Sequence, residues 1–389
     1  MEAEEQLKHN YHNLDLLRSM AVLAVFSAHL WRFGVQFDAW PENHPVTVML
    51  HNLSGCGVMF FFVHTCLVLM LSMRRAPAEN FVRNFYLRRA FRIYPLCWLA
   101  ILLAVVPGWT DRADLTPRLL GWNGIAANFL LVQNLIKLPG GLEASVLGPL
   151  WSLPWEVQMY LVLPFFFLLL RRFRAAATVF ALWSLFAACA FLLCQPRLEH
   201  LHLQGSIYVP MFVSGMAAFR LLEWQQENRN HGLPRLPAWG WPLALTALFA
   251  LPTLQPSDHW LKTPQGSLLG SLVCLALGCA IPCFHSLRAG WITGSAARVA
   301  RYSYGIYLLH VPALYIAFRL GSGLPVAARV LLALLLTGAA AVLTFHLLED
   351  PMIRLGKRLS GAETADLPMK QHAIETPASA PQRDPVVAD

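Results

Sequence analysis

The chain has 389 residues, of which 56% are hydrophobic and 13% are charged, and its mean hydropathy is +0.48. This composition excludes a soluble globular domain of ordinary residue usage and indicates a protein that lies within a bilayer. The net charge of +8 fits basic loops and anionic membrane lipids, so it requires no nucleic-acid partner. The eight cysteines show neither paired metal spacing nor a secreted disulfide framework, so we expect buried small side chains and no metal.

Ten apolar runs predict ten transmembrane helices. In chain order they are centred on residues 14–34, 48–73, 93–108, 149–170, 174–194, 205–222, 240–254, 266–284, 299–319 and 325–348. Residues 119–135 are also apolar, but four amide side chains interrupt them, which favours a re-entrant or interfacial segment. These amides are Asn123, Asn128, Gln133 and Asn134. We therefore expect an all-α polytopic membrane protein with about ten transmembrane helices.

The arginines and lysines predict that both termini lie in the cytoplasm. Every loop that an even number of spans places inside is basic, namely residues 74–92, 171–174, 220–235, 288–301 and 354–358. This is the bias expected of cytoplasmic loops. We therefore expect a cytoplasmic segment over 1–13, a membrane domain over 14–356 and a tail over 357–389. The tail is polar and rich in proline, which predicts a disordered cytoplasmic segment.

Arg18 and His29 lie eleven residues apart in the first apolar run. Eleven helical steps return to within about 20° of the starting direction, so both side chains share one face with ~16.5 Å between their levels. Arg18 would then lie at one membrane surface and His29 near the middle of the bilayer. Ionisable groups at that depth usually line a substrate path or pair with one another. For His29 the alternative is a buried histidine that bonds to a neighbouring helix.

Six segments of the sequence, each with polar or small residues, follow one another along the chain. They are Leu14–His29, Gly57–Val63, Arg83–Leu96, Leu150–Tyr160, Tyr302–His310 and Leu348–Pro351. This order resembles the integral-membrane acyltransferase family 3, the O-acyltransferases that modify bacterial surface sugars and related acceptors. The resemblance runs from about residue 12 to residue 356. Met59 replaces an acidic residue of the family pattern, Thr65 and Cys66 replace Ser-Gly, and Pro154 and Trp155 replace a commoner Ser-Val pair.

The resemblance implies acyl transfer, and His29 fits the role of general base. A neutral imidazole can take the proton of a hydroxyl as its oxygen attacks a thioester. Glu156 and Glu349 complete the expected catalytic set, because one of the two carboxylates would orient the imidazole. The alternatives are a buried hydrogen bond to Gln158 or a tyrosine for Glu156. For Glu349 the alternative is a salt bridge to Arg354 or the inner arginines.

Four arginines form the expected donor site, namely Arg18, Arg88, Arg89 and Arg92. Arginine binds phosphates bidentately and stays charged, so these residues suit the phosphates of acyl-coenzyme A, and we expect acetyl-coenzyme A as the donor. Their alternative role is to anchor the chain at the cytoplasmic surface.

The expected acceptor site uses hydroxyl, amide and imidazole groups of the later motifs. These are Ser152, Gln158, Tyr160, Tyr304, Tyr307 and His310. Tyr304, Tyr307 and His310 follow helical spacing, so packing between helices is the alternative for them.

The sequence therefore predicts an O-acyltransferase of the bacterial inner membrane that esterifies a hydroxyl of a polysaccharide, lipid-linked glycan or similar envelope acceptor. Its partners would be acyl-coenzyme A, the acceptor and membrane lipids, with direct transfer to the final acceptor or help from a separate extracytoplasmic protein. A proton-coupled transporter or lipid-carrier flippase is the main rival, because buried ionisable groups also serve proton relays. The paired broken helices and internal repeat of many transporters are not evident. A polysaccharide polymerase would leave the arginine site unexplained.

Overall fold

A computed structural model describes residues 11–41, 44–76, 80–107, 117–135, 145–173, 175–195, 207–228, 234–257 and 259–361. These residues form helices joined by loops, with no β-strand among them and one isolated bridge between Leu236 and Phe284. The expected all-α class is therefore confirmed.

The long helices follow one another closely along the chain. They are α2 (Tyr11–Gln36), α3 (Val46–Arg75), α4 (Phe81–Val105), α5 (Pro117–Leu130), α6 (Leu153–Arg172), α7 (Ala176–Leu193), α8 (Val209–Glu227), α9 (Gly240–Thr253), α10 (Pro264–Ala280), α11 (Trp291–Tyr315), α12 (Val326–Thr344) and α13 (Asp350–Leu359). Short 3-10 turns are η1 (Gly148–Trp151), η4 (Trp260–Lys262) and η5 (Ile281–Cys283), and π-helical turns are η6 (Ile316–Leu320) and η7 (Phe345–Glu349).

Each of the ten predicted apolar runs overlaps one of these helices. Six stretches of the described chain are long and apolar enough to cross a membrane. They are His12–Gln36, Val46–Arg75, Gly148–Arg172, Ala176–Leu193, Pro264–Cys283 and Val326–Leu359. The number of ten spans and the orientation of the termini stay predictions.

Residues 119–135 overlap α5, a helix of 14 residues that bends at Gly121, where φ is 63°. Its length of ~21 Å is short of the ~30 Å hydrocarbon core. The amides of this segment hold the chain that precedes α6: Asn128 Oδ1 accepts the Val146 N–H at 3.0 Å, and Gln133 donates to the Leu150 carbonyl at 3.1 Å. These bonds explain why polar residues interrupt the apolar run.

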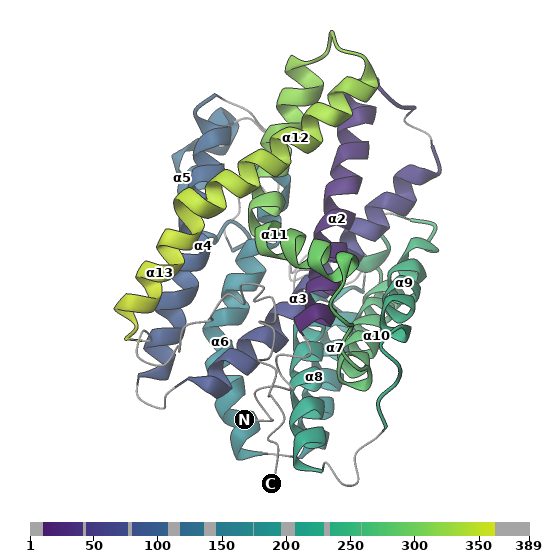
Figure 1. Cartoon of the computed structure of the whole chain (residues 1–389), viewed down its shortest axis with the longest axis vertical. Helices are drawn as coiled ribbons and strands as arrows, with labels where there is room; N and C mark the ends of the chain where they lie inside the picture. The colour runs from purple at the N-terminus through teal and green to yellow at the C-terminus, as the bar shows by residue number, and fades with distance from the viewer. Residues whose placement is uncertain are drawn as a thin grey trace, which may run out of the picture.

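The helices pack as a bundle around α3 (Figure 1). Helix α2 lies against α3 and α11, while α3 also contacts α8, and α8 contacts α7 and α10. Helices α12 and α13 form a long diagonal rod on one face of the bundle, where α12 packs on α11 and α13 packs on α4. Because α2, α4 and α11 meet on this side, residues far apart in sequence come together there.

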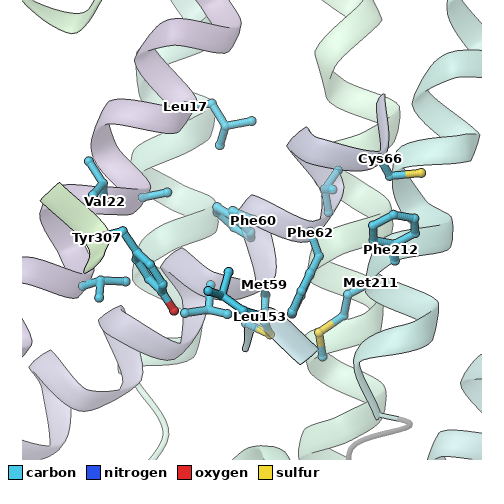
Figure 2. Packing of buried hydrophobic residues seen from close by; sticks show 14 of the residues in the cluster. Leu17, Val22, Met59, Phe60, Phe62, Cys66, Leu153, Met211, Phe212 and Tyr307 are labelled. Carbon is cyan, nitrogen blue, oxygen red and sulfur yellow. The ribbon is translucent and has the colours of Figure 1, made fainter. Parts of the chain in front are cut away.

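The core between these helices is apolar (Figure 2). Phe60 and Tyr307 are buried in the same cluster as Leu153. Met59, which stands at the family's acidic position, is fully buried, and a Cβ on Gly270 would lie 3.2 Å from its sulfur. The departure at position 59 therefore places a thioether in the core instead of a charge.

The first turn of α2 is fixed by side-chain bonds of Asn13. Its amide donates to the His285 carbonyl at 3.1 Å and accepts the Leu287 N–H at 3.0 Å. Trp241 Nε1 donates to the Asn13 carbonyl at 3.0 Å. Each bond satisfies a buried polar group, so the start of α2 is held at a defined place against the segment after α10.

The predicted domain boundaries differ slightly from the helix ends. Helix α2 begins at Tyr11, and α13 continues to Leu359, three residues into the tail that was predicted from residue 357. Residues 1–10 of the predicted segment 1–13, and residues 362–389 of the predicted tail, lie outside the described residues.

We expect Gly215→Val to destabilise the bundle by about 1–3 kcal/mol, because overpacking forces neighbouring atoms apart. A Cβ on Gly215 in α8 would lie 2.5 Å from the Val63 carbonyl oxygen and 2.6 Å from the Cys66 Cβ of α3. Thermal unfolding of detergent-solubilised protein measures the effect. Gly338→Val in α12 is the matched control, since nothing lies within 4 Å of a Cβ there. Equal midpoints for the two variants would contradict this packing.

Candidate active site

Helix α2 carries both Arg18 and His29, as predicted, so the two side chains share one face of a continuous helix. The His29 ring is half-buried, and its Nδ1 lies 2.9 Å from the Val25 carbonyl oxygen. A carbonyl oxygen can only accept a hydrogen bond, so Nδ1 carries the hydrogen and Nε2 of the neutral ring carries the lone pair. That lone pair is what a general base requires.

His310 lies beside His29 although 281 positions separate them in sequence. The two ring centroids are 4.9 Å apart at an interplanar angle of 64°. His310 is fully buried in α11, and its Nδ1 lies 2.9 Å from the Ile306 carbonyl oxygen. The structure thus brings the predicted base together with one residue of the predicted acceptor site.

Ser152 and Tyr307 extend this group toward α6. Their hydroxyl oxygens are 2.7 Å apart, and the Tyr307 hydroxyl also donates to the Pro149 carbonyl at 3.0 Å. The Tyr307 ring centroid lies 6.4 Å from that of His310. The four residues His29, His310, Tyr307 and Ser152 therefore form a contiguous polar group, which we call the histidine group.

A second group gathers around Arg92. Its guanidinium pairs with Glu349 at 3.0 Å, with side-chain exposures of 19% for Arg92 and 1% for Glu349. The same guanidinium lies 5.5 Å from the centre of the Tyr304 ring, whose hydroxyl donates to the Ile93 carbonyl at 2.7 Å. Glu349 is the last residue of the π-helical turn η7, which turns its carboxylate toward α4. The pairing with an inner arginine is the alternative that the sequence left open for Glu349.

Glu156 joins the same group. It lies in the first turn of α6, accepts a hydrogen bond from Tyr160, and interacts electrostatically with Arg18, Arg89 and Arg92. The bond from a neighbouring tyrosine is the alternative that the sequence left open for Glu156. We call Arg18, Arg89, Arg92, Glu156, Tyr160, Tyr304 and Glu349 the arginine group.

One of the two carboxylates was expected to orient His29, and the structure places both of them with the arginines. In the described part of the chain, neither Glu156 nor Glu349 forms a hydrogen bond with the His29 ring, whose Nδ1 bonds to the Val25 carbonyl instead. Both carboxylates lie with the arginines because α6 begins, and η7 ends, at the level of Arg92. In this structure the two carboxylates are placed to orient the arginine side chains.

The structure also places Gln158 and Arg88. Gln158 forms a reciprocal amide pair with Asn134, at 2.9 and 3.3 Å, which ties α6 to the segment after α5. Arg88 lies near Arg89 on α4, where the two like charges repel each other. Gln158 therefore links helices here, and Arg88 lies at the edge of the arginine group.

Sequence reasoning missed two residues near Arg18. His64 is buried in α3 and interacts electrostatically with Arg18, and Asp15 interacts with both Arg18 and Arg301. For Asp15 a signal existed, because it stands three residues before Arg18 on the same helix. His64 carries no comparable signal, because its neighbours in α3 are mostly apolar.

A cavity of about 670 Å³ opens at the other end of α2. It is lined by Val35, Gln36, Asp38, Ala39, Trp40 and Pro41. The lining begins six residues beyond His29, which corresponds to ~9 Å along a helix. His29 therefore lies between the arginine group and this cavity along α2.

Comparison with known proteins identifies the family. A model described as an acyltransferase domain, Acyl_transf_3, matches residues 11–347. Acyltransferase MdmB of Streptomyces mycarofaciens is 26% identical over 386 residues, which cover 93% of this chain and 96% of that protein. The proposed peptidoglycan O-acetyltransferase YrhL of Bacillus subtilis (strain 168) is 25% identical over 376 residues, which cover 89% of this chain and 55% of YrhL.

A third relative is similar over a shorter stretch. The regulator of hypoxia-inducible factor 1 of Caenorhabditis elegans is 26% identical over 196 residues, or 45% of this chain and 38% of that protein. No solved structure matches the chain. Because the family model covers most of the chain and its apolar helices are long enough to cross a bilayer, the chain belongs to the Acyl_transf_3 family and is an integral membrane acyltransferase.

Proposed function

We propose that the chain transfers an acyl group, and first of all an acetyl group, from acyl-coenzyme A to a hydroxyl of a polysaccharide, lipid-linked glycan or similar envelope acceptor. One observation carries the proposal. The helix that holds His29 also holds Arg18 of the arginine group, so a base and an anion site are fixed on one element. The family membership favours an acyltransferase over the transporter, the flippase and the polymerase.

The arginine group suits a phosphate-bearing donor. Arg18, Arg89 and Arg92 face two carboxylates, so the group keeps a net positive charge in addition to the adjacent Arg88. Guanidinium groups bind phosphates through paired N–H donors, and partial burial strengthens such bonds. The phosphates of acyl-coenzyme A would be held there, while its acyl arm extends along α2 toward the histidine group.

The histidine group suits the transfer step. His29 Nε2 takes the proton of the acceptor hydroxyl as that oxygen forms a bond to the thioester carbonyl carbon. The bond from that carbon to sulfur then breaks, and the proton passes from His29 to the thiolate. Atoms and charge balance, with an ester and a thiol as products. Burial of the site limits access of water, which protects the thioester from hydrolysis.

Within this proposal ten helices span the bacterial inner membrane and both termini lie in the cytoplasm. The arginine group would then face the compartment that supplies acyl-coenzyme A, and the cavity at the far end of α2 would admit the acceptor. Transfer reaches the final acceptor directly or through a separate extracytoplasmic protein. A phosphatase that works only outside the cytoplasm, fused after Ser360, is expected to be inactive while a fluorescent cytoplasmic fusion is bright. The reverse result would contradict this topology.

The acceptor is tested in cells. A strain that lacks the gene is expected to lose one ester from an envelope glycan, and mass spectrometry of the released glycans would show the loss of an acetyl mass. Restoring the wild-type gene should restore the ester, and restoring the His29→Gln gene should not. An unchanged glycan profile across all strains would contradict the proposed acceptor class.

Donor binding gives a separate prediction. We expect Arg89→Lys and Arg92→Lys to weaken binding of acetyl-coenzyme A about ten- to hundredfold, because a point charge does not reproduce the guanidinium fork. Titration calorimetry of purified protein at fixed salt measures this change. Arg354→Lys is the control, since Arg354 has a side-chain exposure of 70% and pairs with Asp350 outside the arginine group. If both variants bind acetyl-coenzyme A as tightly as the wild type, the donor-binding role is refuted and these arginines serve only to anchor the chain at the membrane surface.

A further inference from the structure

The contact between His29 and His310 has a chemical consequence beyond the general base. Both Nδ1 atoms lie 2.9 Å from main-chain carbonyl oxygens, those of Val25 and Ile306. Each carbonyl fixes its imidazole with hydrogen on Nδ1, so each neutral ring directs an Nε2 lone pair away from its own helix. The ring centroids lie 4.9 Å apart in an edge-to-face arrangement, so the two imidazoles belong to one site.

His310 Nε2 is buried and has no hydrogen-bond partner within the described part of the protein. A buried acceptor that is left without a donor is destabilising. Tyr307 is close but its hydroxyl is engaged with Pro149 and Ser152. The other ring against His310 is Phe26, which offers no donor. The protein therefore leaves this acceptor atom for a group that it does not itself supply.

We propose that His310 Nε2 accepts a hydrogen bond from a second hydroxyl of the acceptor, adjacent to the hydroxyl that His29 deprotonates. The site would then select acceptors with neighbouring hydroxyls, as a sugar ring carries them, over acceptors with an isolated hydroxyl. This inference rests on the proposed function, because it concerns the same acceptor. The second hydroxyl keeps its proton, so only one ester forms in each turnover.

The proposal is tested by a double-mutant-type cycle, in which both the substrate and the side chain at position 310 are varied. The probes are trans-cyclohexane-1,2-diol and cyclohexanol, which share one ring and differ by one hydroxyl, with acetyl-coenzyme A as donor. Wild-type protein is expected to prefer the diol about 10- to 100-fold in kcat/KM, since a site built for a hydroxyl rejects an analogue that lacks it. His310→Phe is expected to bring the ratio close to one by slowing use of the diol alone.

Two further variants make the cycle specific. His310→Gln retains an acceptor oxygen and is expected to recover part of the preference for the diol. His346→Phe removes a histidine from the exposed face of η7, where it contacts Tyr302, and is expected to leave the ratio unchanged. Circular dichroism and gel filtration confirm that each variant folds before the rates are compared.

Each outcome decides the proposal. If wild-type protein uses both alcohols equally, or if His310→Phe keeps the wild-type ratio, His310 does not recognise a second hydroxyl, although acyl transfer itself stands. If wild-type protein acetylates neither probe while the deletion strain loses an envelope ester, recognition of a diol fails and the proposed function stands. If no probe is acetylated and no ester is lost, both fail.

Discussion

Replacing His29 by glutamine is expected to lower the turnover of acyl transfer about 10²- to 10⁴-fold, the usual loss when a positioned general base is removed. Glutamine fills a similar volume and can still donate to the Val25 carbonyl, which His29 Nδ1 contacts at 2.9 Å. It has no lone pair that accepts a proton near neutral pH. The expected loss is therefore in kcat, with little change in binding of the donor at the arginine group.

The measurement compares purified variants in detergent, with turnover normalised to monodisperse protein and binding of acetyl-coenzyme A measured in parallel. His346→Gln is the matched control, because His346 lies on an exposed face and should leave turnover near the wild-type value. A histidine that serves only packing would lower the thermal midpoint more than turnover. If His29→Gln retains more than about a tenth of wild-type turnover, the general-base role is refuted.

The sequence was sufficient for the part of the site that lies on one helix. Arg18 and His29 share a face because helical periodicity alone determines their directions, and α2 is continuous over both. Arg89 and Arg92 were placed together for the same reason, since they stand three residues apart on α4. Local geometry of this kind does not depend on how the helices pack.

The contacts between helices could not be predicted from the sequence in the same way. His29 meets His310 because α2 packs on α11, and Arg92 meets Glu349 because α13 and η7 pack on α4. Neither pairing leaves a periodic signal in one sequence. The place of Glu156 beside the arginines was not predicted, because hydropathy gives the extent of an apolar run but not where α6 begins relative to its neighbours.

The position at which α6 begins is determined by hydrogen bonds from a segment outside the predicted spans. The Gln133 side chain donates to the Leu150 carbonyl just before α6, and Asn134 pairs with Gln158 inside it. These amides were interpreted from sequence only as interruptions of an apolar run. Their side chains in fact fix the start of α6, and with it Glu156, beside the arginine group.

Removing one member of the Arg92–Glu349 pair is expected to cost about 3–5 kcal/mol in the free energy of unfolding, because it leaves a buried charge without its partner. Glu349→Gln keeps the shape of the side chain and removes its charge, 3.0 Å from the guanidinium. The value should lie near the lower end of the range, since Arg92 is 19% exposed and also interacts with Glu156. Denaturant titration of the detergent-solubilised protein measures the change.

The pair of Arg354 and Asp350, on the adjoining helix α13, provides the control. Its side-chain exposures are 70% and 29%, so Asp350→Asn is expected to change stability by only about 0–1 kcal/mol. The double variant Arg92→Met, Glu349→Leu removes both charges and is expected to recover most of the stability that Glu349→Gln loses, because no unpaired charge remains. It should still fail to bind acetyl-coenzyme A normally. If the double variant is no more stable than Glu349→Gln, the two side chains are not coupled and Glu349 does not position Arg92.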